Sequence, residues 1–199
     1  MTGWEKHEGV AVTLAQENVD TDQLIPARFM SVPRSEGYGD YLLHDLRRDK
    51  TGALRTDLSL NQTAGASVLI AGRNFGCGSS REAAVYALVD AGFCAVVAPS
   101  FGDIFAGNAV NNGLLPAQVS DATIKTLIAE KPGTIHIDLK KRVISVNGAT
   151  YDFDLDDTRQ MKLIKGWDDI DLTRAEDDGI GAYRSELLAR RPWLWPKES

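Results

Sequence analysis

Apolar runs and helically spaced segments alternate along the first half of the chain. Residues 8–15 and 67–72 have the composition of strands, and residues 93–99 form another compact apolar run. Between the last two, small apolar residues recur at positions i, i+3, i+4 and i+7 within residues 80–91, as on the buried side of a helix, and Gly92 suits its C-terminal cap. This succession of strand, helix and strand predicts a βαβ unit, in which two parallel strands are joined by a right-handed crossover.

The second half adds shorter alternating segments at residues 134–139, 142–146 and 149–155, separated by tight turns. Asn147-Gly148, between the last two, is a residue pair that favours a type I′ hairpin. Helical patterns cover four further stretches: 101–111, 121–130, 156–165 and 173–189. The predicted fold class is therefore α/β, with a mixed sheet built on a βαβ core and followed by C-terminal helices.

Residues 31–39 form the most loop-like part of the first half, with one Pro, two Gly and two Ser. Segments of this kind between ordered elements are either linkers or functional lids. A short helix is expected directly after it, over residues 40–48.

The composition favours one domain of ordinary size and concentrates its charge in one segment. The 199 residues include 22 Lys and Arg against 28 Asp and Glu, for a net charge of −6. Ten acidic and four basic residues lie within 152–178, so this segment accounts for the whole net charge. A nucleic-acid-binding domain would be basic instead. We expect a single domain over residues 1–199, whose acidic helical C-terminal segment, about 156–199, is a solvated or partner-facing surface.

Cysteine content and hydropathy predict the compartment. Cys77 and Cys94 are too few for a disulfide framework, which indicates reduced thiols. No apolar run approaches the roughly 18 residues of a membrane span. Residues 1–14 carry several charges and lack the apolar region of a signal peptide. These features predict a cytoplasmic protein that binds neither membrane nor nucleic acid.

The glycine-rich turn at residues 72–78 leads into Ser79, Ser80, Arg81 and Glu82 at the start of the predicted helix. Ser and Glu at this spacing match a capping box, in which each side chain bonds to the other's backbone amide. The unpaired amides and positive dipole end of a helix start, together with a guanidinium, also make a pocket for a carboxylate or a phosphate. The turn is therefore the candidate binding site.

Individual residues exclude three common types of functional site for this turn. A phosphate-binding P-loop needs a Lys before its last Ser or Thr, and no Lys occurs in residues 72–82. The dinucleotide fingerprint needs a third glycine, which this turn lacks. The nucleophile elbow of α/β-hydrolases needs Gly at position 81, where the chain has Arg81.

What remains is a site that binds small carboxylic acids and presents a serine oxygen beside a guanidinium. A serine alkoxide there can remove a proton next to a carboxylate if water is excluded. Elimination of the neighbouring hydroxide then needs a Lewis acid. Two cysteines and no His/Asp group at ligand spacing cannot provide one, since an iron–sulfur cluster needs at least three thiolates as a rule. The residues describe half of an active site.

Three long motifs resemble a known family, the small subunits of 3-isopropylmalate dehydratase, which correspond to the swivelling domain of aconitase. They are NVDTDQLIPARF (18–29), GRNFGCGSSREAAVYALVDAGF (72–93) and FGDIFAGNAVNNGLLP (101–116), and GWDDIDLT (166–173) with IGAYRSE (180–186) fits the bacterial form. The resemblance implies a swivelling β/β/α domain. It also implies a hydro-lyase that is active only with a larger partner subunit carrying a [4Fe–4S] cluster. This chain would bind no cofactor or metal itself.

The resemblance also implies roles for individual residues. Ser79 would be the catalytic base that removes the carbon-bound proton, and Arg81 would join it in the catalytic set. Ser80 and Arg81, with the turn at Gly78, would bind a substrate carboxylate. Arg34 either binds a substrate carboxylate as well or is a solvated charge of its loop. Asp22, in the D-T-D motif, would position the site.

The substrate is expected to be 2-isopropylmalate and its 3-isomer, as in leucine biosynthesis. One departure bears on this expectation: the family's motif runs R-E-H-A, whereas Ala83 follows Glu82 here. Related small subunits act on methylmalate/citraconate, dimethylmalate or homoaconitate, and a non-catalytic carboxylate-binding module is a further alternative. Residues 31–43 resemble the family's specificity loop, with an apolar set that suits an isopropyl group or only packs the next helix: Tyr38, Tyr41, Leu42 and Leu43.

Overall fold

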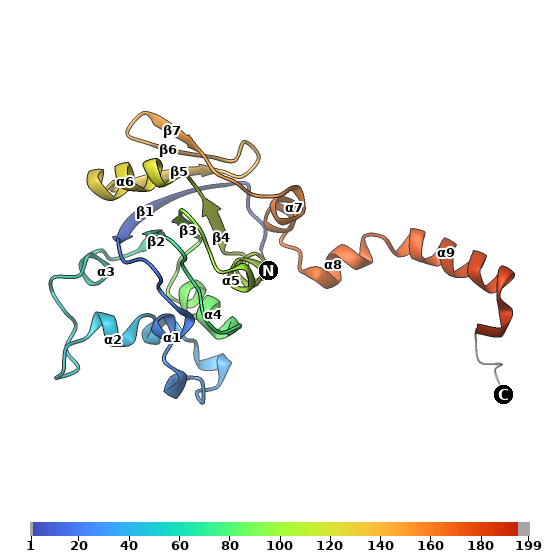
Figure 1. Ribbon diagram of the computed structural model, residues 1–199, viewed down its shortest axis with the longest axis horizontal. Coiled ribbons are helices and arrows are strands. Elements are labelled where there is room, and N and C mark those ends of the chain that lie inside the picture. Colours follow the sequence, from blue (N-terminus) through green and yellow to red (C-terminus); the bar gives the residue numbers. More distant parts are fainter. Residues whose placement is uncertain (1, 195–199) are drawn as a thin grey trace.

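The computed structural model describes residues 2–194, and its strands form one mixed sheet in the order β4-β3-β2-β1-β5-β6-β7 (Figure 1). Strands β1 to β4 are parallel, and β5, β6 and β7 continue the sheet from β1 in antiparallel pairs. The strands are β1 (Lys6–Leu14), β2 (Ala66–Ala71), β3 (Ala95–Ala98), β4 (Leu115–Gln118), β5 (Thr134–Asp138), β6 (Val143–Val146) and β7 (Ala149–Asp152). The predicted α/β class, mixed sheet, βαβ core and final hairpin are confirmed.

The helices come from all parts of the chain. They are α1 (Thr21–Leu24), α2 (His44–Arg47), α3 (Ser59–Gln62), α4 (Glu82–Asp90), α5 (Asp103–Asn111), α6 (Asp121–Glu130), α7 (Asp157–Lys165), α8 (Asp169–Arg174) and α9 (Asp177–Arg190). Single 3₁₀ turns add η1 (Ala27–Phe29), η2 (Arg34–Glu36), η3 (Gly39–Tyr41) and η4 (Pro192–Leu194).

The parallel strands are buried on both faces, which explains their unbroken apolar runs. In β2, Leu69 belongs to the core cluster beneath α1 and α4, whereas Val68 and Ile70 belong to the cluster on the opposite face, with α6. Alternation of side chains along each strand therefore divides one core into two layers. Helix α4 contributes the predicted stripe of small residues to the first layer, with Ala84, Ala87 and Leu88 fully buried.

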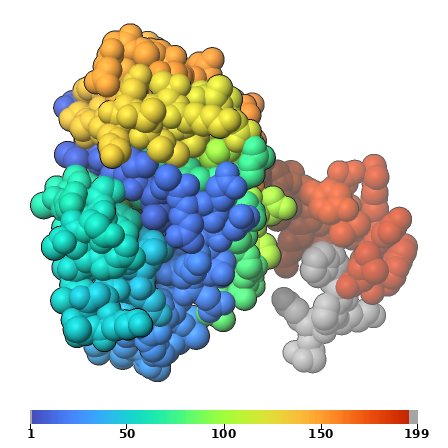
Figure 2. All heavy atoms as spheres, turned by 60° about the vertical axis from the view of Figure 1, so that its left-hand side comes forward, coloured from blue at the N-terminus to red at the C-terminus, as the bar shows by residue number. Residues whose placement is uncertain are grey.

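The C-terminal helices leave the body of the molecule as an extended arm. Figures 1 and 2 show α8 and α9 projecting from the body next to α7, without folding back onto it. We call residues 169–194 the arm. No residue of α8 or α9 is buried. The predicted acidic segment about 156–199 therefore comprises one docked helix, α7, and this arm; its last five positions lie outside the described residues.

Three predicted elements differ from the observed ones, and one observed strand was not predicted. The helix expected over 40–48 is interrupted, because Leu43 adopts a left-handed backbone with φ of 49° before α2. The C-terminal helix expected over 173–189 is two helices, because a break at residues 175–176 separates α8 from α9. Helix α4 begins at Glu82, two residues later than expected. Strand β4 was not predicted, since its short segment carries Pro116 and lacks a clear alternation.

Gly76 has no space for a side chain. An added Cβ would lie 2.2 Å from Cγ of Phe105, and the backbone has a φ of 71°, which side-chain-bearing residues rarely adopt. Phe105 is itself fixed in the core, with its ring 5.4 Å from that of Phe75. The close contact between the turn and α5 therefore requires glycine at this position.

We predict that Gly76→Ala lowers the free energy of unfolding by about 2 kcal/mol or more, since it combines backbone strain with overpacking. Urea unfolding followed by circular dichroism measures this loss. Gly107→Ala in α5, where an added Cβ meets nothing within 4 Å, is the matched control and should leave stability unchanged or raise it. Equal stability of the two variants would contradict this account of the turn.

Candidate functional site

The three sequence motifs converge at the glycine-rich turn, in strand-like contacts outside the named strands. Cys77 forms a parallel bridge with Asp20, and Phe75 forms one with Phe101. The Gly76 amide donates to the Val19 carbonyl at 2.7 Å. Residues that are far apart in the sequence are thereby held side by side, immediately before Ser79.

Helix α1 holds the turn from one side. Asp20 caps α1 by accepting from the Gln23 amide at 2.7 Å, and the Gln23 side chain accepts from the Asp20 amide at 3.1 Å. This reciprocal pair is a capping box. Thr21, which is buried, then donates from its amide to Cys77 O at 2.9 Å and from its hydroxyl to Ser79 O at 3.0 Å. The cap of α1 therefore also positions the backbone of Ser79.

Gly78 shapes the segment between the bridge and the serines. Its φ of 95° lies in the left-handed region, where glycine is favoured. The Ser79 carbonyl, two residues before the N-cap of α4, accepts from the Arg81 amide at 2.7 Å. This hydrogen bond therefore forms a tight backbone turn just before the helix begins.

The capping box predicted for Ser79 and Glu82 is wrong. The N-cap of α4 is Arg81, and no side chain caps this helix end. The Glu82 carboxylate instead accepts from the Asn112 amide group at 2.8 Å. Because tertiary contacts with α1 already fix the turn, helix α4 begins with amides that no side chain occupies.

Ser79 and Ser80 are exposed at this helix start, and neither hydroxyl has a hydrogen-bond partner among residues 2–194. Free hydroxyls and helix-start amides, with the positive end of the α4 dipole, favour an anion. The geometry therefore agrees with a carboxylate-binding site, but one that stands open to water.

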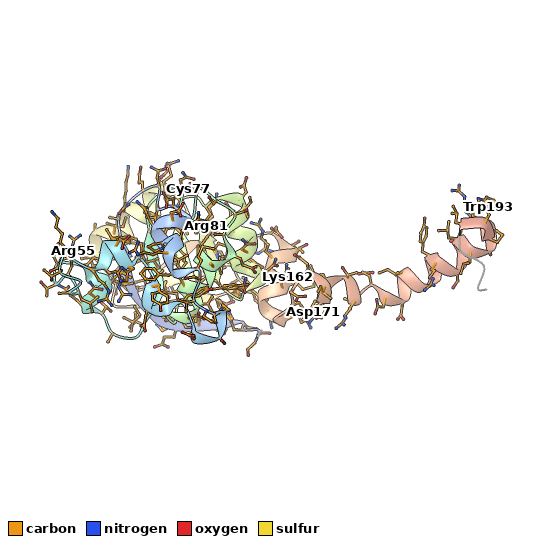
Figure 3. The ribbon with its side chains drawn as sticks, turned by 90° about the horizontal axis from the view of Figure 1, so that it is seen from below. Arg55, Cys77, Arg81, Lys162, Asp171 and Trp193 are labelled. Carbon is orange, nitrogen blue, oxygen red and sulfur yellow. The ribbon has the colours of Figure 1, made fainter. Side chains whose placement is uncertain are left out.

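Arg81 forms an ion pair with Asp22 of α1, from Nη1 to Oδ1. The Asp22 side chain is half exposed, and exposed ion pairs contribute little to stability. A carboxylate ligand can therefore reach the guanidinium at small cost, while Asp22 keeps it directed toward the turn. Figure 3 shows Arg81 and Cys77 on the same side of the body.

Arg34 lies away from these residues. Its guanidinium donates two hydrogen bonds to the Asp90 carboxylate, at 2.6 and 2.9 Å, and packs 4.3 Å from the ring centre of Tyr86. Asp90 ends α4, whereas Ser79 precedes its start; nine helical residues span about 13 Å. The structure therefore brings together Asp22, Gly78, Ser79, Ser80 and Arg81, but not Arg34.

The loop over residues 31–43 is fastened at that far end of α4. The Tyr38 amide donates to the same Asp90 carboxylate at 2.7 Å, and its hydroxyl donates to Val32 O at 3.0 Å. Tyr38, Leu42 and Leu43 are buried in the core beneath α4. These three residues of the expected apolar set therefore pack the fold.

Two supporting residues were missed by sequence reasoning. Thr21 links α1 to the turn, and Asn112 holds Glu82. The Asp-x-x-Gln spacing of residues 20–23 was the available signal, because it marks a capping box. Nothing in the sequence pattern marks Asn112, whose contact depends on how α5 packs against α4.

The described part of the chain offers no cluster of metal ligands. Residues 2–194 contain no group of three or more His, Cys, Asp or Glu side chains close enough to hold an ion. Cys77 and Cys94 are both free thiols, and burial raises the pKa of Cys94. An iron–sulfur cluster does not fit this donor set. No helix in the same residues is long and apolar enough to cross a membrane.

We predict that Asp90→Asn loosens the loop, since it removes the charge that holds Arg34. Backbone amides of residues 31–41 should exchange hydrogen roughly tenfold faster, as measured by mass spectrometry. Asp121→Asn, which breaks the surface pair between Arg73 and Asp121, is the control and should leave the loop unchanged. Unchanged loop exchange in Asp90→Asn would show that Asp90 does not fasten it.

Comparison with known proteins places this geometry in a family. The aconitase C-terminal domain family matches residues 1–122. The 3-isopropylmalate dehydratase small subunit of Shewanella amazonensis is 41% identical over 96% of this chain and 100% of its own length. That of Rhodospirillum centenum is 43% identical over 93% and 95%, respectively. The crystal structure of 3-isopropylmalate dehydratase from Methanocaldococcus jannaschii shares 26% identity with a TM-score of 0.66, covering 90% of this chain and 99% of that one. The chain therefore belongs to the aconitase C-terminal domain family and, within it, to the small subunits of 3-isopropylmalate dehydratase.

Proposed function

We propose that the chain is the small subunit of a hydro-lyase that interconverts 2-isopropylmalate and 3-isopropylmalate by dehydration and rehydration, in leucine biosynthesis. Relatives matched over nearly the whole chain carry the name of this enzyme's small subunit. The observation that carries the proposal is the open turn, which presents Ser79 and Ser80 at an uncapped helix start beside Arg81. This arrangement suits a substrate with carboxylates flanking the reacting carbon atoms.

Ser79 acts as the base. Its Oγ, as an alkoxide, takes the proton from the carbon next to a carboxylate, and the bond between the neighbouring carbon and its hydroxyl group breaks as the double bond forms. The hydroxide released would be taken up by the Lewis acid that the larger subunit supplies. In the rehydration half, hydroxide adds to the carbon that lost the proton, and Ser79 returns that proton to the carbon that lost the hydroxyl group. The α4 dipole and Arg81 supply the positive field that lowers the cost of an alkoxide.

Arg81 and Ser80 bind a substrate carboxylate next to that base. The Arg81 guanidinium binds the ligand carboxylate either in place of Asp22 or together with it. Without ligand, the contact with Asp22 keeps the guanidinium in place. Gly78 gives the turn the backbone conformation that exposes the amides of the helix start. Arg34 serves differently in our proposal: it fastens the specificity loop to Asp90 rather than touching the substrate in this conformation.

A larger partner subunit completes the site. Departure of hydroxide needs a Lewis acid, which in this family is a [4Fe–4S] cluster held by the larger subunit. The exposed serines of this chain also need a cover that excludes water, because an alkoxide base is effective only in a dry site. We place the complex in the cytoplasm, where thiols such as Cys77 and Cys94 stay reduced.

The test of the base is Ser79→Ala in the reconstituted two-subunit complex. We expect turnover to fall by about a thousandfold or more while the complex still assembles, because Ser79 is exposed and holds no contact through its hydroxyl. Ser145→Ala, on β6 and remote in sequence from the turn, is the control and should keep wild-type turnover. Turnover within tenfold of wild type in Ser79→Ala would remove Ser79 from this role.

The substrate is tested separately, because Ala83 follows Glu82 where the family usually has His. Ala83 lies in the first turn of α4 and is buried, so alanine in place of histidine changes the packing at the helix start. We expect kcat/KM of the complex for 2-isopropylmalate to exceed that for citraconate, dimethylmalate and homoaconitate. A higher kcat/KM for one of these acids would assign the chain to that dehydratase instead. Binding without turnover of any would favour a carboxylate-binding module.

A further inference from the structure

The arm exposes apolar side chains that nothing in the described chain covers. On α9, Ile180 and Tyr183 are 47% and 66% exposed, and both project from one side of the helix together with Leu187, which is half-buried. We call these three residues the apolar stripe. At the end of the arm, Trp193 is 74% exposed (Figure 3). Large apolar groups gathered in this way on a projecting element are typical of an interaction surface.

Helix α9 also lacks the features that stabilise a helix on its own. It has 14 residues, a length at which isolated helices are marginal in water. Gly179 and Gly181 each cost about 1 kcal/mol relative to alanine, and no side chain caps its start. Its stability must therefore come from packing against another surface.

The base of the arm is tied to the candidate site. Lys162 of α7, which is buried, donates to Asp169 Oδ1 at 2.6 Å and also contacts Asn111 at the end of α5. Asn111 donates to Asp169 Oδ2 at 3.1 Å, and these contacts lower the pKa of Asp169, first through Lys162 and then through Asn111.

The neighbouring residue carries this connection onward. Asn112 holds Glu82, which follows Arg81 directly. The arm thus starts beside α4 and its uncapped end. In Figure 3 the arm bends toward the side of the body on which Cys77 and Arg81 lie.

We propose that the arm is a clasp that docks through the apolar stripe and Trp193 onto the larger dehydratase subunit. The inference rests on the proposed function, which requires that subunit to cover the turn. Because the arm leaves the body next to that turn, a subunit that covers Ser79 lies close enough to contact the arm. A second copy of this chain would cover the arm but leave the serines without their Lewis acid.

The charges around the stripe indicate the surface that receives it. Glu176, Asp177 and Asp178 precede the stripe at the start of α9, and Asp171 lies on α8. Acidic groups around an apolar centre resemble the polar rim of a protein interface. The receiving surface is therefore an apolar groove with basic residues at its edge. This assigns a role to the four acidic residues at positions 171 and 176–178, which are part of the negative charge concentrated in residues 152–178.

Tyr183→Asp tests the clasp in the full-length chain titrated with the larger subunit from the same source. Sedimentation velocity should show the dissociation constant rising by about tenfold or more, since buried aromatic residues dominate interface energies. Turnover should recover when the larger subunit is in excess, because Tyr183 contacts no site residue. Leu54→Asp is the matched control: Leu54 is 47% exposed, like Ile180, but lies between α2 and α3.

Four outcomes would overturn the proposal, and a fifth would separate it from the role of Ser79. An unchanged affinity in Tyr183→Asp, or an equal loss in Leu54→Asp, would mean that the arm does not dock on the larger subunit. Loss of self-association without loss of affinity for the larger subunit would assign the stripe to a second copy. If Tyr183→Asp weakens assembly as expected while Ser79→Ala stays active, the clasp stands and the role of Ser79 fails. No binding by the wild-type chain would contradict both.

Discussion

The backbone contacts between α1 and the glycine-rich turn are the constraint on which the rest of the site depends. Val19 bonds to Gly76, Asp20 forms a strand-like bridge with Cys77, and Thr21 bonds to Cys77 and Ser79. These contacts fix the course of the chain from Gly76 to Ser79. Gly76 permits α5 to close against the turn from the other side. With the turn held from two sides, helix α4 can begin without a side-chain cap, and its amides remain available to a ligand.

Helix α4 connects two functions at its two ends. Its start carries the amides that we propose bind an anion, and its last residue, Asp90, fastens the loop over residues 31–43 through Arg34 and Tyr38. The small residues on its buried side let it lie close to β2 and β3. A shift of this helix would therefore move the proposed base and the proposed specificity loop together.

Much of the fold and of the candidate site was predictable from the sequence, because local sequence chemistry determines it. The apolar runs of β2 and β3 and the Asn147-Gly148 hairpin follow from patterns spanning a few residues. The turn at Gly78 and the ion-binding potential of Arg81 were also visible in the sequence. Tertiary packing decided the rest.

Residues at the far end of α4 and in the C-terminal helices show why local patterns did not predict these contacts and boundaries. Asp90 lies 56 residues after Arg34, and nothing in the sequence near either residue identifies the two as partners. The capping box of Ser79 and Glu82 was locally favourable, yet Asn112 binds Glu82 instead. The separation of α8 from α9 follows from the break at residues 175–176, which no helical period indicates.

The central claim is that this chain holds half of an active site, which becomes a binding site only beneath the larger subunit. Hydrogen exchange of residues 76–84, measured with and without 2-isopropylmalate, tests it most directly. The account predicts that substrate protects these amides in the two-subunit complex and leaves them unchanged in the isolated chain. Equal protection by substrate in the isolated chain would contradict it.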